Sequence, residues 1–369
     1  MNSKSYKVAV IGCGRIAGHH CRSIASVEGM EMAAVCDLIE EKCKAYSMEF
    51  DVPYFVNYHE MMKTLPEIDI VAVITPSGMH FEHGMEIMEK YAKHIIMEKP
   101  TFMRPSQLVK AYNTAEDLGI NIFPVFQNRY NKAVQRVKKA IRDGEIGDIR
   151  IMGVRVRWCR PQRYYDLAPW RGTFSHDGGV LTNQGIHHVD LLRYLGGEVK
   201  RVNATMRTLG ADIEVEDTVV ATFAYDGDAV GTLEVTTAAR PDDFEASLSI
   251  VGSSGLAQIG GIAVNQLQIF TPDPALCERC SEDFSGSVYG FGHEAMYRDI
   301  LAFFRKGILY PVSREDCLGT IRLLHAFYRS DEAGGWVPVA SDQESTRLGR
   351  PDDALANLYR TPLLTGEKA

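Results

Sequence analysis

Short apolar segments rich in β-branched residues alternate with amphipathic stretches of helical spacing over the first third of the chain. A pair of parallel strands needs a long crossover connection, which a helix supplies, so this alternation predicts a doubly wound parallel sheet of the Rossmann type. The predicted strands are 7–12, 32–37, 68–75, 94–97 and 121–125.

The pattern changes near residue 127. After one more helical stretch, 132–143, a series of strand-like runs is separated by turns at 226–228 and 252–255, where glycine accepts the positive φ of a tight hairpin. Successive strands of this kind predict an open, mainly antiparallel sheet. Its strands are expected at 149–158, 201–209, 218–225, 229–238, 245–251 and 263–270, with helices at 185–194, 294–304 and 314–331.

Together the two patterns predict an α/β domain at 1–127, an α+β domain at 128–340 and a polar C-terminal tail at 341–369. The length of 369 residues agrees with this count, since a domain averages about 150 residues. Hydrophobic residues make up 45% and charged residues 24%, as in ordinary globular proteins.

The charge balance argues against nucleic acid or anionic lipid as a partner, because 40 Lys and Arg face 48 Asp and Glu, a net charge of −8. No apolar run approaches the length of about 20 residues that a membrane span needs, and the apolar segment at 8–11 is too short for a secretory signal. We therefore expect a cytoplasmic protein.

The eight cysteines are scattered rather than arranged as a disulfide framework, so we expect reduced thiols. The single Cys277-x-x-Cys280 pair lacks a second pair at zinc spacing. No metal site is predicted.

A glycine-rich turn follows the first predicted strand and opens a helix. In the pattern Gly12-x-Gly14-x-x-Ala17, the first glycine permits the tight turn and the second lets the backbone approach a pyrophosphate. Ala17 allows close packing of helix on strand, and the helix N-terminus offers N–H groups to the anion. The alternative is a turn that merely contains glycine.

Asp37 ends the second predicted strand, 20 residues beyond Ala17, where a carboxylate accepts hydrogen bonds from the adenosine ribose. It would repel a 2′-phosphate, and the next residues, Leu38 to Glu40, supply no compensating cation. The cofactor is therefore predicted to be NAD, unless Asp37 is only a surface residue at a strand end.

Two further motifs follow strands of the same sheet: Thr75-Pro76 with His80, and Glu98-Lys99-Pro100. Ligands of open parallel sheets bind at the carboxyl ends of the strands. Lys99 can place a cation beside a substrate hydroxyl, and Pro100 fixes the turn that aims it, with a cis bond as one way to do so. A solvated turn lysine is the alternative.

In the second half, the segment 178–190 runs from a glycine turn into a predicted helix. Asn183 and His187 are four residues apart, so they share a face if the helix begins early enough. His187, with an ordinary pKa near 6.5, is suited to removing a hydroxyl proton, although a structural histidine is the alternative. Adjacent His187 and His188 point apart on a helix, which argues against a metal.

Five arginines, at 150, 155, 157, 160 and 163, fall within 14 residues of an otherwise acidic chain. Arginine binds diphosphates and carboxylates bidentately, and Tyr164, Tyr165 and Trp170 nearby could pack on a sugar or a base. The alternative is a solvated edge strand protected by charge.

The ordered set of these motifs resembles the Gfo/Idh/MocA family of NAD(P)-dependent sugar oxidoreductases over roughly residues 6 to 340. That resemblance implies that Lys99 and His187 act on the substrate hydroxyl. The family usually has Asp four residues before the histidine, whereas this chain has Asn183, which cannot accept a proton. Asn183 is therefore expected to bind the substrate by hydrogen bonds.

The departure at Asn183, together with 157–158, 164–166, 170–172 and 289–293, resembles the branch that oxidises UDP-N-acetylglucosaminuronic acid (UDP-GlcNAcA) at C3. A free-sugar or inositol dehydrogenase, an NAD-dependent glycosidase and a non-catalytic dinucleotide sensor are the alternatives. The family's habit of pairing its sheets implies a homodimer or homotetramer.

The expected site residues follow from the motifs and the resemblance. Lys99 and His187 are the catalytic candidates. The dinucleotide is expected to contact Gly12, Gly14, Arg15, Ile16, Asp37, Thr75, Pro76, His80, Glu98, Lys99 and Gln127. The substrate is expected to contact Lys99, Arg157, Tyr164, Tyr165, Arg171, Asn183 and His187.

Overall fold

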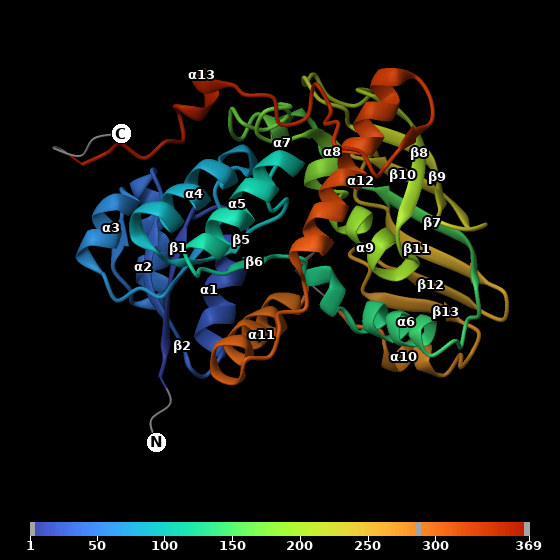
Figure 1. Ribbon diagram of the computed structural model, residues 1–369, viewed down its shortest axis with the longest axis horizontal. Coiled ribbons are helices and arrows are strands. Elements are labelled where there is room, and N and C mark those ends of the chain that lie inside the picture. Colours follow the sequence, from blue (N-terminus) through green and yellow to red (C-terminus); the bar gives the residue numbers. More distant parts are fainter. Residues whose placement is uncertain (1–3, 285–288, 365–369) are drawn as a thin grey trace. The chain divides into compact units, whose positions relative to one another are not determined.

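The structure, a computed structural model, describes residues 4–284 and 289–364 (Figure 1). It divides into two compact units. The first comprises the described parts of 1–125, 293–317 and 351–369, and the second comprises the described parts of 126–292 together with 318–350. None of the described helices combines the length and apolar character that a membrane crossing requires.

The first unit is built on a sheet of six parallel strands in the order β3-β2-β1-β4-β5-β6. The central strands are buried on both faces, which explains why they read as continuous apolar runs rather than alternating ones. The strands are β1 (Tyr6–Ile11), β2 (Met30–Cys36), β3 (Tyr54–Phe55), β4 (Ile70–Val73), β5 (His94–Met97) and β6 (Ile122–Pro124).

Helices connect these strands, as the alternation predicted. They are α1 (Ala17–Ser26), α2 (Glu40–Phe50), α3 (Tyr58–Thr64), η1 (Ser77–Met79), α4 (His80–Tyr91) and α5 (Pro105–Asp117), with α11 (Gly292–Lys306) and α13 (Asp353–Ala356) joining from far along the chain.

Helix α11 belongs with the first unit because its aromatic side chains pack on that unit's core. The ring of Phe304 stacks on Tyr6 at 4.7 Å and lies 5.5 Å from Phe123, with both distances taken between ring centroids. Similarly, Arg360 forms an ion pair with Glu82 of α4 at 2.7 Å. The predicted domain limits differ from this division, because a chain that returns to an earlier unit leaves no local signal in its sequence.

The second unit holds an eight-stranded sheet in the order β13-β12-β11-β7-β10-β9-β8-β14. All neighbours are antiparallel except β7 and β10, which pair in parallel. The strands are β7 (Ile149–Arg157), β8 (Val199–Arg207), β9 (Thr218–Tyr225), β10 (Val230–Thr236), β11 (Glu245–Gly252), β12 (Leu256–Gly260), β13 (Gln266–Phe270) and β14 (Val337–Pro338). The fold class predicted from the sequence is confirmed.

Helices α6, α8 and α9 contact this sheet (Figure 1). The covered face is apolar: Gly231, Leu233 and Val235 of β10 are buried, whereas Val230 is half exposed on the other face. The helices associated with this unit are η2 (Gln127–Tyr130), α6 (Lys132–Arg142), α7 (Gln162–Tyr165), α8 (Gly179–Asn183), α9 (Ile186–Gly196), α10 (Leu276–Arg279) and most of α12 (Arg314–Ala333).

Candidate active site

The turn between β1 and α1 has the geometry of a dinucleotide cradle. Gly12 has a φ of +95°, and a Cβ added there would lie 2.5 Å from the carbonyl oxygen of Ile74, so only glycine fits. A Cβ added at Gly14 would meet nothing within 4 Å, which leaves room for a ligand to approach the backbone. Gly14 and Arg15 are exposed, and Ile16 is half-buried immediately before α1.

Asp37 lies directly after β2 and is tied to this turn. Its Oδ2 accepts a hydrogen bond from the Cys13 N–H at 2.7 Å, and its Oδ1 accepts one from the Ile39 N–H at 2.9 Å. A carboxylate offers about four acceptor positions, so ribose hydroxyls can be bound as well. Leu38 and Ile39 beside it are 39% and 48% exposed and offer an apolar surface for an adenine. The residues present therefore fit NAD.

The motifs that follow β4 and β5 lie at the carboxyl ends of two adjacent strands. The His80 ring nitrogens lie 2.8 Å and 2.9 Å from the carbonyl oxygens of Pro100 and Thr75, so this buried side chain joins the two motifs. The Thr75 hydroxyl lies 2.9 Å from His83 Nδ1, and Pro76 directly precedes η1. The Lys99–Pro100 peptide bond is cis.

Glu98 is buried within a cluster that the sequence analysis did not identify. Its Oε1 lies 3.0 Å from His20 Nε2 and 3.8 Å from His293 Nε2, and the other nitrogen of His20 contacts the Tyr297 hydroxyl. Burial would raise the pKa of Glu98, but its contacts with His20 and His293 outweigh burial and hold that pKa well below its usual range. Two features of the sequence could have indicated this cluster: a histidine in the first turns of α1, and the segment 289–293, which contains His293.

In the second unit, Asn183 and His187 lie on two short helices rather than one. Helix α8 ends at Asn183, and α9 begins at Ile186 after Gly185. The His187 Nε2 lies 3.1 Å from the side-chain nitrogen of Gln127. Helix α9 is anchored by Asp190, whose carboxylate accepts two hydrogen bonds from the buried guanidinium of Arg129 at 2.6 and 2.7 Å. The neighbouring His188 is buried, and burial lowers its pKa to about 4.

Several predicted substrate-binding residues gather beside α8. The Asn183 side-chain N–H donates to the buried carboxylate of Asp177, whose other oxygen accepts from the Gly172 N–H at 2.7 Å. The Arg171 guanidinium lies over the rings of Tyr164 and Trp170, 4.4 and 4.5 Å from their centroids. Asp177 was missed from the sequence, because nothing marked it as the partner of Asn183 six residues later.

Arg171 Nε is buried and has no hydrogen-bond partner among residues 4–284 and 289–364. Burying a donor without a partner costs about 1–3 kcal/mol. A ligand with acceptor oxygens would remove that cost, so Arg171, which lies beside Tyr164 and Trp170, is a candidate for an anion contact in the second unit.

Of the arginine cluster, Arg160 reaches this group, with its guanidinium 5.6 Å from the ring centroid of Tyr164, while Arg157 is engaged elsewhere. The Arg157 guanidinium is paired with Glu234 through two hydrogen bonds of 2.6 and 2.9 Å, and Arg160 pairs with Asp243 at 2.7 Å. Tyr165 is buried and hydrogen-bonded to the Thr237 hydroxyl at 2.9 Å. The remaining members, at 150, 155 and 163, are exposed.

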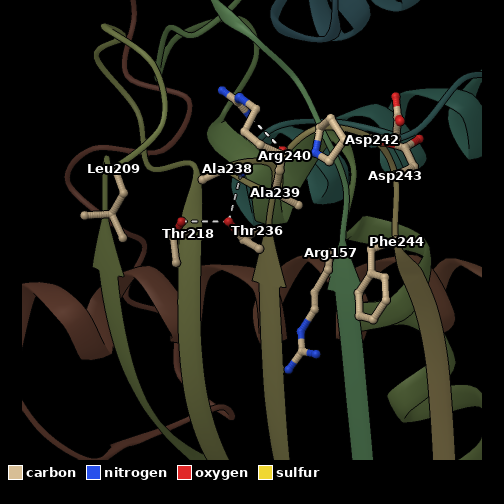
Figure 2. Close-up of a pocket in the computed structure, with 11 residues that line it drawn as sticks. Arg157, Leu209, Thr218, Thr236, Ala238, Ala239, Arg240, Asp242, Asp243 and Phe244 are labelled. Atoms are coloured by element: carbon tan, nitrogen blue, oxygen red, sulfur yellow. Dashed lines mark hydrogen bonds between the residues drawn. The ribbon is translucent and has the colours of Figure 1, made fainter.

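Arg157 also lines a cavity of about 520 Å³ at one end of the sheet (Figure 2). Its wall is mainly threonine, alanine and apolar side chains, and its second arginine, Arg240, donates to the carbonyl oxygens of Thr237, Ala239 and Gly210. The predicted catalytic residues do not line this cavity.

Beneath α8, the buried side chain of Glu216 accepts a hydrogen bond from the Tyr328 hydroxyl at 2.7 Å. Burial raises the pKa of Glu216 to about 8, whereas its ordinary value is 4.5. Between these two pH values the unfolded chain loses this proton and the folded protein keeps it, so stability falls as pH rises and levels off above about pH 8.

We therefore expect Glu216→Gln to remove part of the pH dependence of unfolding. The difference in free energy of unfolding between the variant and the natural protein should rise in favour of the variant from pH 5 to pH 8. Its upper limit is about 5 kcal/mol, which corresponds to the whole shift in the Glu216 pKa from 4.5 to about 8. Chemical denaturation at the two pH values measures this difference. Parallel pH profiles for the two proteins would show that Glu216 is ionised in the folded state.

The combination of a dinucleotide cradle, a carboxylate at the end of β2 and a separate sheet unit defines an NAD-dependent oxidoreductase. Two family models match: "Oxidoreductase family, NAD-binding Rossmann fold" over residues 6–125 and "GFO/IDH/MocA C-terminal domain" over residues 134–258. The chain belongs to the Gfo/Idh/MocA family of oxidoreductases, as its motifs predicted.

Among solved structures, the chain is similar to the WlbA dehydrogenase from Bordetella pertussis in complex with NADH and UDP-GlcNAcA. The two are 33% identical, with a TM-score of 0.87, over 93% of this chain and 100% of that one. The WlbA dehydrogenase from Chromobacterium violaceum, also with NADH and UDP-GlcNAcA, is 32% identical with a TM-score of 0.85, over 93% of this chain and 98% of that one. The D-glucoside 3-dehydrogenase of Escherichia coli is 28% identical over 63% of this chain and 68% of its own length.

From the position of Asp37 we expect NAD to bind more tightly than NADP, and Asp37→Ala to narrow that difference by about tenfold. Titration calorimetry with both cofactors measures it. Asp37→Asn keeps an acceptor for the Cys13 N–H and separates loss of charge from disruption of the turn, while Glu41→Ala removes a nearby exposed carboxylate as a control. Equal affinities for the two cofactors in the natural protein would contradict the assignment.

Proposed function

We propose that this NAD-dependent sugar dehydrogenase oxidises C3 of UDP-GlcNAcA in nucleotide-sugar biosynthesis. The observation that carries the proposal is Arg171, whose buried Nε is without a described partner and whose guanidinium lies over Tyr164 and Trp170 beside α8. A guanidinium and aromatic rings suit a ligand with both an anionic group and a flat face. The similarity to two WlbA dehydrogenases over nearly the whole chain supports the same substrate.

In this proposal, Lys99 and His187 act on the hydroxyl group that is oxidised. The Lys99 ammonium stabilises the oxygen as it loses its proton, and His187 takes that proton. The bound NAD supplies the hydride acceptor, so the carbon loses a hydride and becomes a carbonyl. Asn183 binds the sugar, with its amide oriented by Asp177.

Gln127 selects the tautomer of His187. Its amide lies against Nε2, and an amide presents a donor at one end and an acceptor at the other. The Gln127 side-chain N–H donates to Nε2, so the neutral ring carries its own proton on Nδ1, and Nε2 is the nitrogen that takes the substrate proton when the hydroxyl replaces the amide. Gln127 therefore serves the catalytic histidine in this proposal, in addition to the cofactor contact expected from the sequence.

The test is formation of NADH by the purified protein with UDP-GlcNAcA, compared with free sugars and inositols, and with product identified by mass spectrometry. Turnover of UDP-GlcNAcA with the highest kcat/KM supports the proposal. Higher kcat/KM with an unphosphorylated sugar favours a free-sugar dehydrogenase. Sugar release without net NADH identifies a glycosidase, and NAD binding without any turnover identifies a sensor.

We also propose that the protein is a homodimer or homotetramer that covers the open face of its second sheet. On that face Val220, Val230 and Ile151 are 56%, 50% and 49% exposed, and Val230 and Ile151 are direct neighbours on β10 and β7, so a second copy would cover these apolar side chains. Light scattering at micromolar concentration is expected to give at least twice the monomer mass, and Val220→Lys should lower it. A monomeric mass for the natural protein would contradict this proposal.

A further inference from the structure

A buried chain of contacts leads from α11 to the backbone of Lys99. The Tyr297 hydroxyl lies 2.8 Å from His20 Nδ1, and His20 Nε2 lies 3.0 Å from Glu98 Oε1. The second carboxylate oxygen, Oε2, accepts a hydrogen bond from the Lys99 N–H at 2.9 Å. Each link is therefore within hydrogen-bond distance.

The chemistry of the partners determines which group donates and which accepts in each of these hydrogen bonds. An ionised carboxylate only accepts hydrogen bonds, so His20 Nε2 must carry a proton, and in the neutral ring Nδ1 then accepts from the Tyr297 O–H. Glu98 thus has a donor on each oxygen, one from His20 and one from the Lys99 backbone. A hydrogen bond that involves an ionised group is roughly twice as strong as a neutral one.

Water plays little part in holding these groups. His20 and Tyr297 are fully buried, Glu98 is 5% exposed, and the ring of His293 packs edge-on against His20 at 4.9 Å between centroids. A buried carboxylate that loses its donor cannot replace it with solvent, so it must move or change its protonation state. His293 Nε2 also faces Glu98 Oε1, but at 3.8 Å it is beyond hydrogen-bond distance, so the position of Glu98, and with it the Lys99 backbone, depends chiefly on His20.

We propose that His20 and Tyr297 are positioning residues that hold Glu98 and, through it, the backbone of Lys99. Neither side chain contacts a reacting group in this proposal, which rests on the role proposed above for Lys99. Helix α1 follows the glycine-rich turn, so a single helix carries both the start of the dinucleotide cradle and the support of the lysine.

A matched pair of substitutions at position 20 separates positioning from stability. The amide of Gln reaches the position of Nε2 and keeps the donor to Glu98, whereas the amide of Asn reaches only the position of Nδ1 and keeps the contact with Tyr297. We expect His20→Asn to lower kcat by tenfold or more, since displacements of about 1 Å have effects of this size or larger. His20→Gln should retain most of kcat, and neither variant should change KM for NAD by a comparable factor.

Three further measurements make the test independent of any one variant. Tyr297→Phe should lower kcat less than His20→Asn, because it removes only the outer link. In a Glu98→Gln background, His20→Asn should have little additional effect on kcat, since both substitutions interrupt the same series of hydrogen bonds. Crystal structures should show the Lys99 N–H contact to position 98 kept in His20→Gln and lost in His20→Asn, whether or not the substrate assignment is right.

Several results would overturn the proposal. One is equal kcat values for His20→Gln and His20→Asn after correction for the folded fraction, which indicates a merely structural histidine. Another is an unchanged Lys99 turn in the crystal structure of His20→Asn. A third is one equivalent of tightly held metal by elemental analysis, lost in His20→Asn, because His20, Glu98 and His293 would then be ligands. If Lys99→Met itself retains full turnover, the catalytic role of Lys99 fails, and the crystal structures still decide the positioning.

Discussion

Turnover should fall by a factor on the order of a hundred or more when Lys99 is replaced by methionine or His187 by alanine, while NAD binding persists. Lys99→Met keeps most of the length of the side chain and removes the charge that stabilises the developing alkoxide. His187→Ala removes the base and leaves Gln127 without its partner. Steady-state NADH formation and NADH titration by fluorescence measure the two properties separately.

Lys110→Met is a control for Lys99→Met, because Lys110 is an exposed lysine of α5 in the same unit. It should leave turnover unchanged. Near-normal turnover in His187→Ala would transfer the role of base to Lys99. Loss of NAD binding in either variant would contradict the catalytic assignment, because the residue would then serve mainly to hold the cofactor.

The second large effect concerns the sugar carboxylate. UDP-GlcNAcA should be oxidised with a kcat/KM about tenfold to a hundredfold above that of neutral UDP-N-acetylglucosamine, because a hydrogen bond to a charged group contributes about 1.5–3 kcal/mol. The difference should shrink as salt concentration rises if the contact is partly solvated. Initial rates with the two nucleotide sugars give the ratio, and a preference for the neutral sugar would contradict the substrate assignment.

Two arginine variants test where that selectivity arises. Arg171→Met should lower the ratio toward one, because Arg171 Nε is without a described partner. From the sequence, Arg157→Ala is expected to raise KM, but Arg157 is already bound to Glu234 by two hydrogen bonds. Arg157→Met therefore serves as the matched comparison. If Arg157→Met lowers the ratio and Arg171→Met does not, then Arg157 binds the sugar carboxylate, and its pairing with Glu234 breaks when the substrate binds.

Local patterns in the sequence were sufficient for most of the fold. The strands 94–97 and 218–225 were predicted with the bounds that the structure has, because apolar runs and turn residues delimit them. Strand β3, with two residues, and strand β14, also with two, were missed because so short a run has no periodicity. The parallel pairing of β7 with β10 was also missed, since it depends on a long-range register that no local pattern encodes.

Site residues could be predicted only where they form a motif of consecutive or closely spaced residues. The turn at Gly12 and the Glu98-Lys99-Pro100 motif are of this kind. His20 and Tyr297 lie 277 residues apart and come together only in the folded chain, so their link could not be read from spacing. For Arg157 the residue type was suggestive, but Glu234, its partner in the structure, is 77 residues away and the sequence does not reveal it.

The return of α11 to the first sheet has a consequence for synthesis on the ribosome. When the strands through β6 have emerged, the surface around Tyr6 and Phe123 still lacks Phe304, which is translated more than 180 residues later. A nascent Rossmann sheet therefore presents aromatic side chains that a chaperone or a premature partner can bind. A gene fragment that stops after residue 127 would encode this incomplete state permanently, so the cofactor-binding half cannot be excised with a single cut.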